Sequence, residues 1–125
     1  MATVLTNVGE DWAAQRLAGS GAMSAATGQY IGWGTGAGTA AKGDTTLFTE
    51  SAESRTAGTV SVTGSGATAK YQVVGTITAT ASRAITNAGN FDASTSGNLF
   101  VHGDFATINL STDDSIQFTI TIDPS

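Results

Sequence analysis

The clearest pattern of hydrophobic and polar positions lies near the C-terminal end of the chain. Between Ser115 and Ile122, large apolar residues alternate with serine, glutamine and threonine without a break. A period of two is typical of a β-strand with one buried face, so the apolar residues should face a core. They are Ile116, Phe118, Ile120 and Ile122. The pair Asp113-Asp114 predicts a turn before this strand, and Pro124 ends it.

An earlier stretch predicts a long β-hairpin. Residues Thr59–Thr63 alternate, and Gly64-Ser65-Gly66 then favours a turn. The run Tyr71–Thr80 that follows has three large residues on one face, namely Tyr71, Val73 and Ile77. Its other face is mostly polar and is free to contact water or a neighbouring subunit.

Before this hairpin, the segment Gln29–Trp33 predicts a short strand. The glycine-rich residues Gly34–Ala41 predict a loop, and a polar connection runs from Lys42 to Arg55. Leu47 and Phe48 are the expected anchors of that connection on the core.

After the hairpin, three strands are expected over Arg83–Phe91, Asn98–His102 and Phe105–Leu110. The separators are Ser94-Thr95-Ser96-Gly97 and Gly103-Asp104, which have turn-forming compositions.

A short helix is expected near the N-terminus. Asn7 or Thr6 can cap it, and Glu10 and Asp11 place negative charge in its first turn. We expect the helix to dock on a sheet through Trp12 and to stop at the glycines that follow it.

These elements predict a single domain over residues 1–125, mainly β, with about six or seven short strands. The expected architecture is an antiparallel, jelly-roll-like β-sandwich with one short N-terminal helix. Residues 1–6 are expected to form an extended arm that adds a strand to a neighbouring chain.

Composition narrows the function. Charged residues make up only 12 % of the chain and cysteine is absent, so the surface is rich in hydroxyls and small apolar groups, which suits contact with protein. A net charge of −5 with five scattered basic residues argues against a nucleic-acid partner. No apolar run approaches the roughly 20 residues that span a bilayer, so no membrane segment is expected.

Three motifs resemble known sites, but each lacks the context that its chemistry needs. Gly32–Ala37 fits a loose dinucleotide pattern without the helix that must follow. Asp92–Gly97 resembles half of a calcium loop, yet its twelfth position is Gly103 instead of glutamate. His102 and Asp104 have no partner serine in a nucleophile elbow. We therefore expect no enzymatic activity, no cofactor and no metal.

Two segments together resemble small structural domains of tailed bacteriophages. The first combines a strand ending in G-x-G-T with a D-T-x-L…E…R connection, and the second is an I-T-x-A-G-x-F…D-S-I-x-F-T ending. The residues that match are Tyr30–Gly36, Gly43–Glu50, Arg55, Ala84–Asp92, Phe105–Leu110 and Asp113–Ile120, together with the helix around Gly9–Trp12.

This resemblance implies a virion protein made in the host cytoplasm. The expected function is that of a head decoration, or cement, protein on the capsid surface, with the major capsid protein and copies of itself as partners, a trimer being favoured. The alternative is a tail-associated or tail-fibre adhesin domain that binds host glycan. The candidate interface residues are Tyr30, Trp33 and Tyr71 as aromatic anchors and Ala2, Thr3, Val4 and Leu5 of the arm.

Overall fold

The computed structural model of the chain describes residues 3–17 and 29–123. Within these ranges lie eight strands, one α-helix and one short 3-10 helix. In chain order they are β1 (Thr3–Leu5), α1 (Asn7–Leu17), β2 (Tyr30–Gly34), β3 (Thr56–Ala57), β4 (Thr59–Thr63), η1 (Gly66–Thr68), β5 (Lys70–Thr78), β6 (Arg83–Phe91), β7 (Leu99–Leu110) and β8 (Ser115–Ile122).

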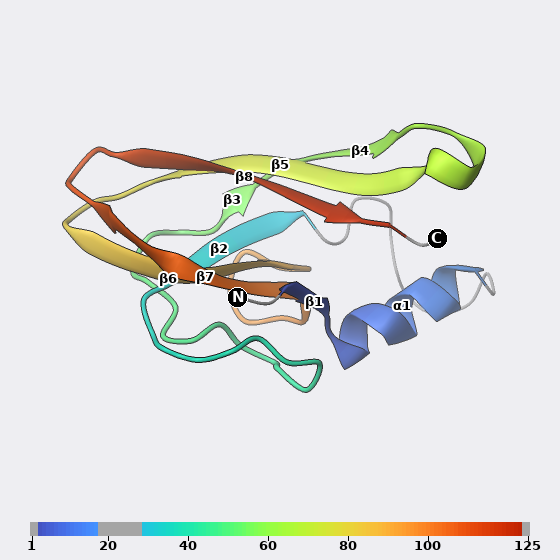
Figure 1. Cartoon of the computed structure of the whole chain (residues 1–125), viewed down its shortest axis with the longest axis horizontal. Coiled ribbons are helices and arrows are strands. Elements are labelled where there is room, and N and C mark those ends of the chain that lie inside the picture. The colour runs from blue at the N-terminus through green and yellow to red at the C-terminus, as the bar shows by residue number, and fades with distance from the viewer. Residues whose placement is uncertain (1–2, 18–28, 124–125) are drawn as a thin grey trace.

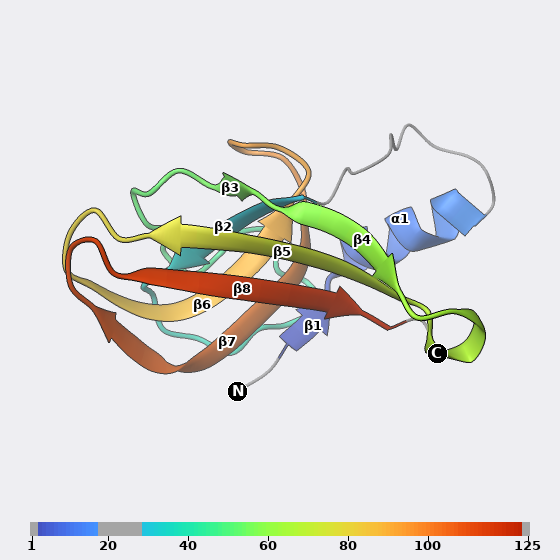
Figure 2. The same ribbon diagram turned by 90° about the horizontal axis from the view of Figure 1, so that it is seen from above.

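The strands form two antiparallel sheets that pack face to face, which confirms the predicted sandwich (Figure 1). The five-stranded sheet has the order β1-β7-β6-β2-β3, and the three-stranded sheet has the order β4-β5-β8. Two hairpins, β4–β5 and β6–β7, each stay within one sheet, whereas the turn from β7 to β8 crosses between sheets (Figure 2). The β7 and β8 strands therefore lie along the same side of the molecule.

The main core lies between the two sheets. Its fully buried members are Ile31, Trp33, Val73, Ile77, Ala79, Ile85 and Ala88. The β8 strand was predicted to turn its apolar residues inward, and Ile116, Phe118 and Ile120 do pack against this core. All four polar residues of β8 are exposed, so its alternation of half-buried and exposed positions confirms the prediction.

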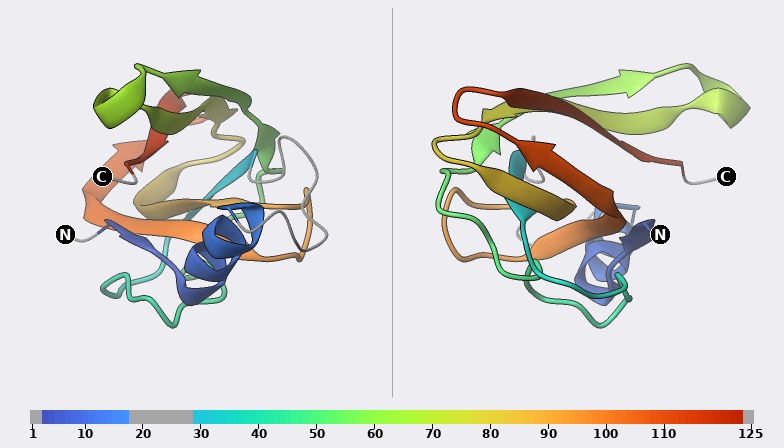
Figure 3. Two further views of the ribbon diagram at one scale, coloured as in Figure 1. Left: turned by 90° about the vertical axis from the view of Figure 1, so that its right-hand side faces the viewer. Right: turned by 60° about the vertical axis from the view of Figure 1, so that its left-hand side comes forward.

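A second apolar cluster lies on the outer face of the five-stranded sheet. It contains Leu47, Phe91 and Leu99, with Tyr30 packed against it. Leu47 belongs to the connection between β2 and β3, which crosses this face on the side away from the three-stranded sheet (Figure 3). Leu47 thus anchors the connection as expected, and the five-stranded sheet is covered on both faces.

The N-terminal residues depart from the prediction of a free arm. Thr3–Leu5 form β1 and pair antiparallel with β7 of the same chain, from Thr3 opposite Gly103 to Leu5 opposite Val101. The adjacent edge of β7 offers unpaired backbone groups to these residues, so they are used within the chain.

The helix begins as the sequence predicts. The hydroxyl of Thr6 accepts a hydrogen bond from the Gly9 amide at 3.1 Å and donates one to the Leu99 carbonyl at 2.5 Å. The helix lies beside β7. The predicted docking by Trp12 and the glycine stop fall outside the described side chains and residues.

The prediction of a break at Gly103-Asp104 is wrong, because β7 is one strand from Leu99 to Leu110. Gly103 pairs with Ala88 and Asp104 with Asn87, and the register of the two strands shifts between Ile85 and Asn87, where β7 has the extra residues. A Cβ at Gly103 would lie 2.9 Å from the hydroxyl oxygen of Thr3. The glycine therefore admits β1 at close range and does not make a turn.

Candidate protein-binding site

One side of the sandwich is open along β8. The strand pairs with β5 over eight residue pairs, from Thr78 opposite Ser115 to Tyr71 opposite Ile122. No other strand of the described chain pairs with its second edge. Successive residues of a strand direct their backbone groups to alternate sides, so about four residues of β8 present unpaired N–H and C=O groups.

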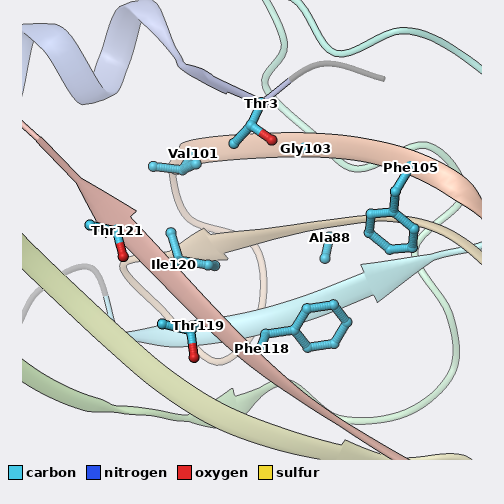
Figure 4. A pocket seen from close by; sticks show the side chains of 9 residues that line it. All are labelled: Thr3, Ala88, Val101, Gly103, Phe105, Phe118, Thr119, Ile120 and Thr121. Carbon is cyan, nitrogen blue, oxygen red and sulfur yellow. The ribbon is translucent and has the colours of Figure 1, made fainter.

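An apolar groove lies beneath this edge, between β8 and the β1–β7 side of the other sheet. Its volume is about 210 Å³. The largest side chains that line it are Val101, Phe105, Phe118 and Ile120 (Figure 4). The rings of Phe105 and Phe118 approach each other from opposite sheets, with 6.4 Å between their centroids. A free edge beside an apolar groove is the arrangement with which a sheet accepts an added strand.

Next to this groove is a face with few charges. On the outside of the three-stranded sheet, the exposed residues of β8 and β5 carry hydroxyl and amide side chains, namely Thr76, Thr78, Ser115, Gln117, Thr119 and Thr121. None of these residues is aromatic. The one charged side chain of these two strands is that of Lys70, which is 43 % exposed and lies 3.6 Å from Asp123 at the end of the sheet. The face and the groove share β8 and together form the candidate binding site.

The aromatic anchors proposed from the sequence divide into buried and half-buried residues. Trp33 is 1 % exposed and belongs to the core, so its assignment as an interface anchor is wrong. Tyr30 and Tyr71 are half-buried. Burial raises the pKa of the Tyr71 hydroxyl, and a hydrogen bond with Asn90 opposes that rise. Neither tyrosine is among the residues that line the groove.

Of the arm residues proposed as interface contacts, only some lie at the groove. Thr3 lines the groove, whereas Val4 and Leu5 are half-buried within β1. Ala2 lies outside the described residues. Thr3 is thus the one arm residue that the structure places at the candidate site.

A buried carboxylate, Glu53, fixes the connection that covers the five-stranded sheet. It accepts hydrogen bonds from the Trp33 indole at 2.9 Å, from the Thr80 amide at 3.0 Å and from the Arg83 guanidinium at 2.9 Å. The Ser51 and Thr80 hydroxyls also donate to it. Burial alone would raise the pKa of this carboxyl, but the hydrogen bonds from Ser51, Trp33 and Thr80 hold it well below its ordinary value of 4.5. These donors satisfy the negative charge of Glu53 inside the fold, so we assign the carboxylate a structural role.

The only histidine is enclosed in the same cover. The His102 side chain is fully buried, with Nδ1 2.7 Å from the Asp44 carboxylate and Nε2 3.0 Å from the Asn87 side-chain oxygen. Phe48 fixes the orientation of the Asn87 amide, because its backbone N–H donates to that amide and its carbonyl accepts from it. Both ring nitrogens therefore face acceptor oxygens inside the fold. Among the described residues, no hydroxyl is hydrogen-bonded to the ring, and its bonds to Asp44 and Asn87 hold the connection on β7.

The two glycine- and aspartate-rich motifs also have structural explanations. A Cβ at Gly34 would lie 2.4 Å from the Phe48 carbonyl oxygen, so the end of β2 requires glycine where it runs beside residues 48 and 49. In the Asp92–Gly97 loop, the Asp92 carboxylate accepts from the Asn98 backbone at 2.7 Å and from its side chain at 3.1 Å. The carboxylate thus closes the turn of the β6–β7 hairpin.

Over residues 3–17 and 29–123, no group of three histidine, aspartate or glutamate side chains is placed to hold a metal ion. No helix in these ranges has the length and apolar character needed to cross a membrane. Comparison of the chain with protein-family models, curated proteins and solved structures gave no match.

Proposed function

We propose that this chain is a non-catalytic structural protein of a tailed-phage particle, a decoration protein that binds the outer surface of the head and stabilises contacts between capsomers of the major capsid protein. The observation that carries the proposal is the outer face of the three-stranded sheet beside the open β8 edge, where the exposed residues of β5 and β8 carry hydroxyl and amide groups and Lys70 is the one charged side chain. Such a face can approach another protein at a small cost of desolvating charges. The resemblance of the chain to phage structural domains supports the same function.

The burial of the titratable groups also supports a structural role. Glu53 and His102 are saturated by partners inside the fold, so neither presents a reactive group to a substrate. Catalysis needs titratable groups that converge on a ligand pocket, whereas the groove described above has an apolar lining.

A glycan-binding tail domain is less well supported. Sugar binding by a sandwich commonly uses aromatic rings exposed on a flat face. Trp33 is buried between the sheets, the Trp12 side chain lies outside the described ones, and the outer face of β5 and β8 exposes no aromatic ring. The head is therefore the favoured location.

The proposal is tested by adding the purified protein to parent particles that lack it and imaging them by cryo-electron microscopy. We expect density at symmetry-related positions on the head, saturable binding, and heads that withstand more heating before they release DNA. Copies should cluster as closed rings, with trimers favoured, because capsids present repeated sites. Density on the tail alone, or no binding, would contradict the proposal.

A further inference from the structure

We propose that the β8 edge and its groove bind an extended strand from a different protein, one with small apolar residues at alternate positions and basic residues at both ends. This inference deepens the proposed function, on which it rests, because it identifies the contact through which the chain attaches. It concerns residues Ser115–Ile122 and the groove beside them.

The backbone of β8 defines the kind of ligand. Edges that must stay unpaired normally carry lysine, proline or a bulge, and β8 contains no charged residue, no proline and no break in its eight pairs with β5. A strand added beside β8 would satisfy its free N–H and C=O groups. We therefore expect the ligand to bind as a β-strand.

The groove defines the side chains of that strand. Side chains of an added strand alternate between the two faces of the sheet, so every second one would point inward beside Phe118 and Ile120. A volume of about 210 Å³ is several times the roughly 30 Å³ share of one water molecule, which leaves room for small apolar side chains. Valine or alanine at alternate positions fits this apolar space.

The charges at the two ends of β8 define the flanks of the strand. Asp113 and Asp114 are exposed immediately before the strand, and Asp123 is exposed immediately after it. The Nζ atom of Lys70 lies 3.6 Å from a carboxylate oxygen of Asp123. Both side chains are 43 % exposed, so this ion pair is weak. Basic residues at both ends of the incoming strand complement this pattern.

The same charges argue against a second copy of β8 as the ligand. Antiparallel pairing about a two-fold axis would place Asp113 and Asp114 of one chain near Asp123 of the other, at both ends of the contact. Like charges placed opposite each other across strands are destabilising. Electrostatics thus selects a basic-flanked strand from another protein.

The test uses the intact chain and a synthetic peptide of alternating valine and threonine with two lysines at each end. We expect saturable binding that slows hydrogen exchange at alternate β8 amides and leaves β4 unchanged. A matched peptide with glutamates in place of the lysines should bind about tenfold more weakly, and raising the salt concentration should narrow this difference. Equal binding of the two peptides, or protection that excludes β8, would overturn the proposal.

A pair of variants locates the groove. Ile120→Lys places a charge in it, whereas Val62→Lys places the same charge on the inner face of the opposite edge strand, where Val62 is 73 % exposed. We expect at least about tenfold weaker peptide binding in the first variant and unchanged binding in the second. If both variants fold and bind the peptide equally, the groove is not the binding site and the proposal is refuted. The exchange pattern is measured on the unaltered protein, so it decides the question even if Ile120→Lys does not fold.

Two further outcomes separate this inference from the proposed function. Self-association without peptide, accompanied by protection of β8, would identify a second copy as the occupant and overturn the inference. Attachment to heads with no effect of the lysine peptide would overturn the inference and leave the proposed function standing. Peptide binding at β8 without attachment to heads would support the inference and contradict the proposed function.

Discussion

The carboxylate of Glu53 links distant parts of the chain. Its partners are Trp33 in β2, Thr80 in the turn after β5 and Arg83 at the start of β6. The Glu53 side chain is 3 % exposed and that of Arg83 is 25 % exposed, so this ion pair is largely shielded from water. Removing one partner from such a network leaves the other groups buried and incompletely satisfied.

We expect Glu53→Gln to lower the free energy of unfolding by about 3 kcal/mol, because the amide cannot accept all of these hydrogen bonds or balance Arg83. Urea denaturation followed by circular dichroism measures the change. The matched control is Glu10→Gln, since the Glu10 side chain is 50 % exposed in its pair with Lys42. The control should change stability by about 0.5 kcal/mol or less. If the two variants lose equal free energy of unfolding, burial of the Glu53 carboxylate does not determine its contribution to stability.

The depressed pKa of Glu53 also predicts a pH dependence. Because this pKa is lower in the folded chain than its ordinary value of 4.5, the stabilisation is fully present above about pH 4.5 and is lost as the pH falls below it. We expect the stability difference between the unaltered protein and Glu53→Gln to shrink between pH 5 and pH 2. Denaturation curves across this range measure it, and a constant difference would refute the assignment.

These residue-level contacts could not be predicted from the sequence. The partners of His102 are Asp44 and Asn87, which lie far from it along the chain, whereas sequence proximity suggested Asp104. Glu53 carries no local pattern that distinguishes it from Glu50. Only the crossing of the β2–β3 connection over the sheet brings these groups together, and no periodicity encodes that path.

Among the elements, the strands with long alternating patterns were predictable. The β8 strand and the β4–β5 hairpin match their expected positions, because each repeats a period of two over several residues. Strands β1 and β3 have only three and two residues, which is too short for a periodic signal. Their pairing depends on the edges that longer strands present, so it appears only in the folded chain.

The junction between β1 and α1 gives a test at the scale of elements. Thr6 is fully buried and both caps the helix and bonds the Leu99 carbonyl. We expect Thr6→Ala to cost about 1–2 kcal/mol, since it removes both interactions. Thr3→Ala in the exposed part of β1 is the matched control and should cost about 0.5 kcal/mol or less. A Thr6→Ala protein as stable as this control, measured by urea unfolding, would show that the junction is not held by the hydroxyl.

At the scale of the whole molecule, the two sheets differ in how much of their surface is covered. The five-stranded sheet is packed on one face by the other sheet and on the other by the connection that carries Leu47 and Phe48. The three-stranded sheet is covered on its inner face only, and its outer face exposes threonine, serine and glutamine. The motif residues Asp44, Glu50 and Arg55 serve the covered side, where Arg55 stacks on the Phe91 ring 3.4 Å away and pairs with Glu50. The outer face of the three-stranded sheet is thus the side available for a partner.

Under the proposed function, this asymmetry predicts which face would dock on a particle. The chain has no cysteine, so Thr76→Cys on the outer face of the three-stranded sheet and Thr46→Cys on the connection across the opposite side each introduce a single thiol at an exposed position. On attachment to heads, we expect maleimide labelling of Thr76→Cys to fall at least about tenfold, because a docked partner excludes reagent and water from the interface core. Labelling of Thr46→Cys should stay within about twofold of its rate in the free protein, since that side faces away from the partner. Protection of the Thr46→Cys thiol instead would mean that the molecule docks through its covered side, and the outer face of the three-stranded sheet would then have no part in attachment.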